Sequence, residues 1–118
     1  MDLKISDLLG MQRELQDKYE AKWGGTPPER GALQLLWGIG EIGEVIDIIN
    51  KRGADEIMHD PVTRAHLVEE MSDVMMYLLD VMLCYGITAE EYSEAHAKKH
   101  AHNMHRDYVS ENRHLFDK

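Results

Sequence analysis

Two short stretches, Glu41-Ile42-Gly43-Glu44 and Glu70-Met71-Ser72-Asp73, decide how this chain can fold. Each stretch places two carboxylates three residues apart within an apolar run, and residues at that spacing share one face of a helix. Two such helices packed face to face bring four carboxylates together, although partly buried like charges repel one another and are costly to desolvate. The pattern therefore predicts a bound cation, and the all-oxygen ligand set favours Mg²⁺, with Mn²⁺ as the alternative.

The composition of the chain limits the classes of protein to which it can belong. The 118 residues are enough for a single domain, 1–118, with one core. A formal net charge of −9 without a basic stripe argues against a nucleic-acid partner. No apolar run approaches the ~20 residues that span a bilayer, so no membrane partner is expected. A single cysteine, Cys84, and an N-terminus without signal-peptide order predict a cytoplasmic protein.

Hydrophobic periodicity and the positions of glycine and proline predict an all-α chain built as a four-helix bundle. The expected helices cover residues 4–22, 29–51 and 61–85 and a stretch from residue 88, with a connecting loop at 54–60. The residues from Tyr108 have weak periodicity and are expected to fray or to dock on a partner. The second and third helices are apolar over more than half of their circumference. We therefore expect a second copy of the chain to bury the excess apolar surface.

The acidic motifs and their surroundings resemble those of the MazG-type all-α nucleoside triphosphate pyrophosphohydrolases. The resemblance covers residues 8–106 and rests on Trp37–Asp47 (WGIGEIGEVID), Glu69–Leu79 (EEMSDVMMYLL) and the pattern Lys99-x-x-x-Asn103-x-x-Arg106. It implies Mg²⁺-dependent hydrolysis of a nucleoside or deoxynucleoside triphosphate to the monophosphate and pyrophosphate. It also implies the all-α bundle of that family, completed by assembly into a homodimer or homotetramer.

The resemblance also assigns roles to individual residues. The metal ligands it implies are Glu41, Glu44, Glu70 and Asp73. Glu44 or Glu41 is also expected to act as the catalytic base for the attacking water, although sequence alone does not separate a base from a ligand. The residues it implies for holding the triphosphate are Lys99, Asn103 and Arg106, which fall at i, i+4 and i+7 of the fourth helix. Taken alone, the Glu41/Glu44 pair can be an ordinary solvated helix face, and the four acids together can instead be hydrogen-bonded or protonated structural acids. The set Lys99, Asn103 and Arg106 can be an exposed polar helix face.

Several further residues are candidates for contacts with a nucleotide. Trp37 lies one turn before Glu41 and can stack on a base, or else belong to the core. Trp23 and Lys22 can form a lid, and Gln12 can bind a base edge or be an ordinary solvated glutamine. His96 and His100 are spaced for zinc, but they lack a cysteine partner and lie on a helix that is polar all round.

Two rival functions follow from the same residues. The first is a non-catalytic helical oligomer that binds nucleotide or a partner protein and keeps a vestigial acidic site. The second is a di-iron or di-manganese redox bundle, which requires histidine ligands that the second and third helices lack at the required spacing.

Overall fold

The protein is all-α, as the sequence predicts, in a computed structural model that describes residues 1–106. No strand occurs in this range. The helices are α1 (Ile5–Lys18), α2 (Glu20–Trp23), the 3₁₀ turn η1 (Pro28–Arg30), α3 (Gly31–His59), α4 (Pro61–Cys84) and α5 (Ala89–Met104). The prediction for the residues from Tyr108 lies outside the described part of the chain.

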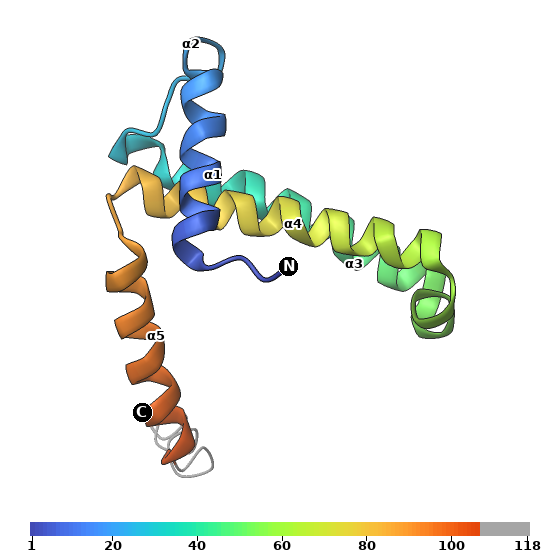
Figure 1. Ribbon diagram of the computed structural model, residues 1–118. Helices are drawn as coiled ribbons and strands as arrows, with labels where there is room; N and C mark the ends of the chain where they lie inside the picture. Colours follow the sequence, from blue (N-terminus) through green and yellow to red (C-terminus); the bar gives the residue numbers. More distant parts are fainter. Residues whose placement is uncertain (107–118) are drawn as a thin grey trace, which may run out of the picture. The chain divides into compact units, whose positions relative to one another are not determined.

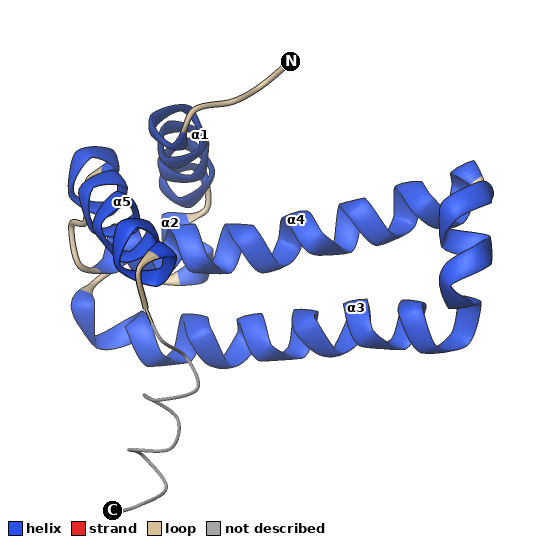
Figure 2. Ribbon diagram, turned by 90° about the horizontal axis from the view of Figure 1, so that it is seen from below, coloured by secondary structure: helices blue, strands red, loops and turns tan. Residues whose placement is uncertain are grey.

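Helices α3 and α4 form a long antiparallel hairpin that carries both acidic motifs (Figures 1 and 2). The turn between them is set by Asp60, whose side chain accepts a hydrogen bond from the Val62 N–H at 3.0 Å. Pro61 follows at the first helical position, where its missing N–H costs no hydrogen bond. The helices approach closely at Gly38, where an added Cβ would lie 3.2 Å from the Cβ of Tyr77.

The prediction of a connecting loop at residues 54–60 was wrong, because this stretch is largely helical. Gly53 breaks the α-helical geometry, with φ 81° and ψ 162°, and the chain then resumes a helical turn that runs to His59. Only glycine adopts this conformation readily. The sequence correctly placed a break at Gly53, but the residues behind it (Ala54, Asp55, Glu56) carry no breaker, so a new turn of helix forms.

Helix α1 packs against α4, while α2 and η1 connect α1 to the start of α3. The segment between α2 and η1 reverses direction at Gly24 and Gly25, which both have positive φ values. Arg13 on α1 donates a hydrogen bond to the Thr26 hydroxyl at 3.1 Å, which holds this segment against α1. These contacts place α1 and the α2–η1 segment over one end of the hairpin (Figure 2).

The chain divides into two compact units, Met1–Ile87 and Thr88–Lys118. In the second unit, α5 begins as predicted at Thr88, whose side chain accepts a hydrogen bond from the Glu91 N–H at 3.1 Å.

The single domain and the four-helix bundle remain predictions. Among the described helices, none is by itself both long and apolar enough to cross a membrane.

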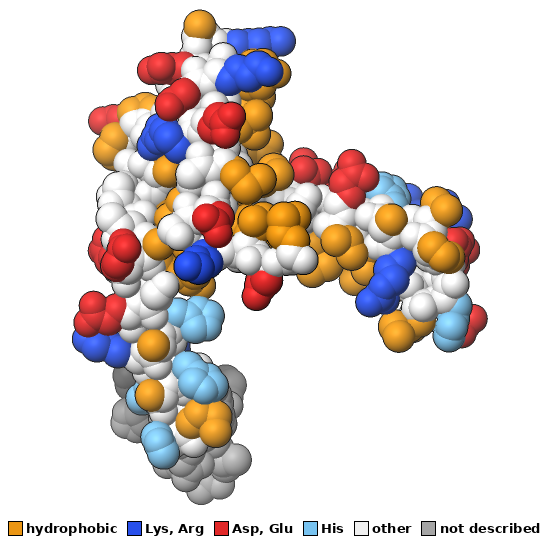
Figure 3. All heavy atoms as spheres, in the orientation of Figure 1, with side chains coloured by type: hydrophobic (Ala, Val, Ile, Leu, Met, Phe, Trp, Pro, Cys, Tyr) orange, Lys and Arg blue, Asp and Glu red, His pale blue; other side chains and the backbone are white. Residues whose placement is uncertain are grey.

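The hairpin exposes much of its apolar surface (Figure 3). Isoleucines along one arc of α3 are about half exposed, and methionines on α4 are similarly open. The exposed apolar side chains of the two helices include Leu35, Leu36, Ile39, Ile42, Ile46, Ile49, Val68, Met71, Met75 and Leu78. No large side chain in the described residues is fully buried. The first unit therefore leaves uncovered the surface that the sequence assigned to a second copy.

Candidate metal centre and adjoining cavity

Three carboxylates from the two hairpin helices converge at one point. Glu41 on α3 and Glu70 and Asp73 on α4 each offer an oxygen, and these oxygens all lie within 4.8 Å of one another. All three residues are partly buried. No other group of this kind occurs within residues 1–106, so His96 and His100 are not part of one. The sequence predicted this convergence from the two acidic motifs.

The electrostatics of the cluster suit a cation. Partial burial, together with the negative charges of Asp73 and Glu70, raises the pKa of Glu41. His66 is exposed, and its Nε2 lies 3.4 Å from the Glu70 carboxylate. Three mutually repelling carboxylates form an oxygen-rich donor set of the type that Mg²⁺ and Mn²⁺ prefer. The residues present therefore fit a divalent cation.

The fourth predicted ligand, Glu44, is not one of the three converging residues. Its side chain is exposed, although its charge still contributes to raising the pKa of Glu41. A residue three positions along a helix is rotated by about 60° from the first. Glu41 lies on the face that meets α4, and Glu44 therefore lies beside that face. Its role as ligand or base stays a prediction.

The predicted phosphate-binding residues belong to the second unit. Lys99 and Asn103 lie on α5, whereas Arg106 lies beyond the end of that helix at Met104. The predicted continuous helical face of these residues is therefore interrupted before Arg106. Their role in holding a triphosphate stays a prediction.

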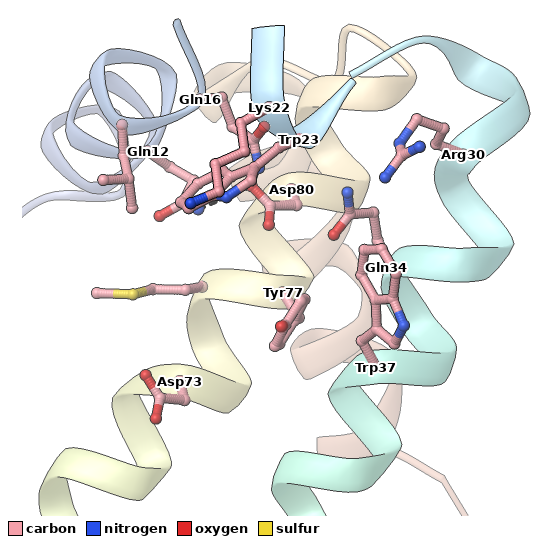
Figure 4. A pocket seen from close by; sticks show the side chains of 12 residues that line it. Gln12, Gln16, Lys22, Trp23, Arg30, Gln34, Trp37, Asp73, Tyr77 and Asp80 are labelled. Carbon is pink, nitrogen blue, oxygen red and sulfur yellow. Dashed lines mark hydrogen bonds between the residues drawn. The ribbon is translucent and has the colours of Figure 1, made fainter. Parts of the chain in front are cut away.

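A cavity of about 770 Å³ adjoins the acidic cluster. Figure 4 shows the side chains that line it. Asp73 belongs to both the cluster and the wall of this cavity. The size is within the range of pockets that bind small molecules. The other lining residues come from all parts of the first unit: Gln12, Leu15, Gln16, Lys22, Trp23, Arg30, Gln34, Trp37, Met76, Tyr77 and Asp80.

The walls of the cavity carry aromatic rings and cations. Trp37 is 43% exposed, so it is not a core tryptophan, and its ring lies 6.3 Å from that of Tyr77 in a tilted arrangement. The Arg30 guanidinium lies over the Trp37 ring, 5.6 Å from its centroid. Trp23 also lines the cavity and stacks on Tyr19 at 4.6 Å. Such walls offer flat apolar faces beside positive charge.

A buried polar cluster forms another part of the wall. Asp80 accepts hydrogen bonds on Oδ1 from the side-chain amides of Gln12, at 2.8 Å, and Gln16, at 2.9 Å. Burial raises the pKa of Asp80, while the two amide hydrogen bonds and the more distant charge of Arg13 oppose that rise. Gln12 was expected either to bind a base edge or to be solvated. It is buried, so the solvated alternative was wrong, and it lines the cavity.

Sequence reasoning missed seven residues that line the cavity: Leu15, Gln16, Arg30, Gln34, Met76, Tyr77 and Asp80. A signal for two of them was present, because Tyr77 and Asp80 follow Asp73 by four and seven residues and so continue its helical face. Gln12 and Gln16 are likewise one turn apart. The polar residues on each of these two helix faces indicated contact with other polar groups. They did not indicate which groups those are.

Comparisons with protein-family models, with curated proteins and with solved structures found no match for this chain.

Proposed function

We propose that the protein hydrolyses a nucleoside or deoxynucleoside triphosphate to the monophosphate and pyrophosphate, with Mg²⁺ or Mn²⁺ as the cofactor. The observation that carries this proposal is the convergence of Glu41, Glu70 and Asp73 within 4.8 Å. A cavity large enough for a nucleotide shares Asp73 with that cluster. The resemblance of the acidic motifs to the pyrophosphohydrolase family supplies the reaction.

The three clustered carboxylates would hold the metal, with Glu44 as a further ligand. A bound divalent cation neutralises phosphate charge and makes a coordinated water more acidic. The chain supplies the remaining chemistry. Glu41 or Glu44 accepts the proton of the water that attacks the α-phosphorus, and pyrophosphate leaves.

Cations in the cavity wall support a polyanionic substrate. Lys22 and Arg30 line the cavity, and a guanidinium can bind a phosphate through two parallel hydrogen bonds. The formal net charge of the chain is −9, and these two residues place positive charge in the wall of the cavity. Lys99, Asn103 and Arg106, which the resemblance implies as phosphate-binding residues, are proposed to contact the triphosphate.

The test is release of pyrophosphate from a panel of nucleoside triphosphates in the presence of Mg²⁺. We expect Glu41→Gln and Asp73→Asn to reduce turnover by about a hundredfold or more, since a lost metal ligand removes transition-state stabilisation. The matched control is Glu69→Gln, because Glu69 is an exposed acid next to Glu70. Turnover that survives both ligand substitutions would rule out the proposed site. Nucleotide binding without hydrolysis in the parent protein would favour the non-catalytic rival.

A further inference from the structure

We propose that Asp80 and Gln34 in the cavity wall bind the hydrogen-bonding edge of the nucleobase and select bases that carry an exocyclic amino group. The proposal deepens the proposed function, because it names the substrate class at the same site. It rests on a buried aspartate and a buried glutamine, each of which keeps side-chain atoms that make no hydrogen bond to another described residue.

Asp80 is 3% exposed and has no ion-pair partner within residues 1–106. Both glutamine amides donate to the same oxygen, Oδ1. Within that range, no hydrogen bond reaches Oδ2. A buried carboxylate is stabilised by as many donors as can reach it, and this one retains an oxygen that can accept more. The amides of Gln12 and Gln16 fix the orientation of the carboxylate, which a binding site requires.

Gln34 is also 3% exposed, and its amide makes no hydrogen bond to any described residue. Figure 4 shows its side chain directed from α3 into the space that faces α4. Gln16 adds a second unused group, because its Oε1 is buried without a hydrogen-bond partner among the described residues. Buried polar groups in folded proteins are nearly always paired, so the buried Oε1 of Gln16 indicates an absent partner that bears its own donor. The unbonded side-chain atoms of Gln34 and Asp80 line the same cavity and can contact the same partner.

The chemistry of the wall selects among the bases. A carboxylate accepts hydrogen bonds from the amino group of cytosine, and a glutamine amide pairs with the adjacent donor and acceptor of adenine. Uracil and hypoxanthine carry a carbonyl in the corresponding position, and that carbonyl would face the lone pairs of Asp80. Trp23 and Trp37 in the same cavity offer ring faces on which a base of either size can stack.

The rival explanation is that Asp80 only ties α1 to α4. In that case its removal weakens the fold and affects every nucleotide alike. A role in base recognition instead predicts a change in the ratio of affinities between two bases. That ratio is the measurement that separates the two explanations.

The experiment is a fluorescence titration of the full-length protein with CMP and UMP, and with AMP and IMP, without metal. The chain has two tryptophans and both line the cavity, so their emission reports its occupancy. We expect the amino-bearing member of each pair to bind about tenfold or more tightly. Equal affinities within a pair, or no binding of any of the four, would overturn the proposal.

Two variants test which residues are responsible. Asp80→Asn keeps the shape but replaces an acceptor with a donor, so we expect the preference to disappear or to reverse toward UMP and IMP. Gln34→Leu leaves Asp80 and its two amide partners in place, and we expect it to reduce the discrimination as well. It therefore tests the proposal even if Asp80→Asn does not fold.

The matched control is Asp55→Asn, because the Asp55 side chain is 98% exposed and lies outside the cavity. A preference left unchanged by Gln34→Leu and by a folded Asp80→Asn would overturn the assignment of these residues.

Failure of the proposed function is distinguishable from failure of this inference. Selective binding of CMP over UMP without pyrophosphate release from any triphosphate would remove the hydrolase and keep the base site. Pyrophosphate release at equal rates from CTP and UTP, with equal binding of CMP and UMP, would keep the hydrolase and remove the base site.

Discussion

At the scale of single residues, Asp80 is a buried carboxyl group whose ionisation opposes folding. Its ordinary pKa is 3.8, and burial raises the pKa in the folded protein. The folded chain therefore binds this proton more tightly than the unfolded chain does. The stability that the group contributes is fully present below the unfolded pKa and is lost as the pH rises through the folded pKa.

A comparison of the parent protein with Asp80→Asn isolates this effect, because the other titrating groups are shared. We expect the free energy of unfolding of the parent, relative to the variant, to fall as the pH rises from about 3.5 and then to level off above the folded pKa. Urea unfolding curves at a series of pH values measure the difference. A difference that stays constant, or that grows with pH, would contradict the raised pKa.

Glu41 is the residue at which metal binding and stability should be coupled most directly. Burial and the neighbouring carboxylates make its ionised form unfavourable in the absence of a cation. We expect Mg²⁺ to raise the melting temperature of the parent protein. A gain of about 1 kcal/mol corresponds to roughly 4 °C in a domain of this size.

The same thermal measurement on two variants tests which residues bind the cation. Glu41→Gln should lose the effect of Mg²⁺ and should melt higher than the parent when no metal is present, because one source of repulsion is gone. Glu69→Gln should respond to Mg²⁺ as the parent does. Equal shifts in all three proteins would mean that the cation binds elsewhere.

At the scale of elements, the long helix α3 depends on a glycine at its break. Gly53 has φ 81° and ψ 162°, and no atom outside its own neighbourhood lies within 4 Å of the place where a Cβ would sit. The constraint at this position is therefore backbone conformation and not crowding. A side chain at such φ and ψ values is strained by about 1–3 kcal/mol.

We therefore expect Gly53→Ala to lower the free energy of unfolding by about 1–3 kcal/mol, measured by urea denaturation. The matched control is Gly40→Ala, because Gly40 lies within regular helix and also has nothing within 4 Å of its added Cβ. That control should be stabilised by about 0.5–1 kcal/mol, owing to the higher helix propensity of alanine. If the Gly53→Ala variant is as stable as the parent, the backbone conformation at this position does not require glycine.

At the scale of the whole molecule, the exposed apolar arcs of α3 and α4 predict self-association. Ile39, Ile42, Ile46 and Ile49 repeat along one side of α3, and each is 44% exposed or more. Met71, Met75 and Leu78 form a comparable row on α4. Contiguous apolar surface of this kind marks an interface in soluble proteins. A second copy is the predicted partner, as a homodimer or homotetramer.

Light scattering after size-exclusion chromatography tests this prediction. We expect the parent protein to elute as a dimer or tetramer and Ile46→Lys to shift it toward the monomer, because a buried charge at an interface is costly. Ala54→Lys adds the same charge to an exposed residue of α3 outside the isoleucine row and should leave the assembly unchanged. A monomeric parent protein would contradict the prediction.

The sequence by itself determined the helical class, the break at Gly53 and the start of α4 at Asp60 and Pro61. It also determined that carboxylates of the two acidic motifs converge. These features follow from local rules, because helical periodicity and capping depend on residues within a few positions of one another. Only the tertiary structure decided that Glu41 meets Glu70 and Asp73 while Glu44 lies to one side. It also decided that Gln12 and Gln16 bind Asp80, more than sixty residues away along the chain. Such contacts depend on the angles and registers at which helices pack, and those are set by side chains from all of the packed elements together.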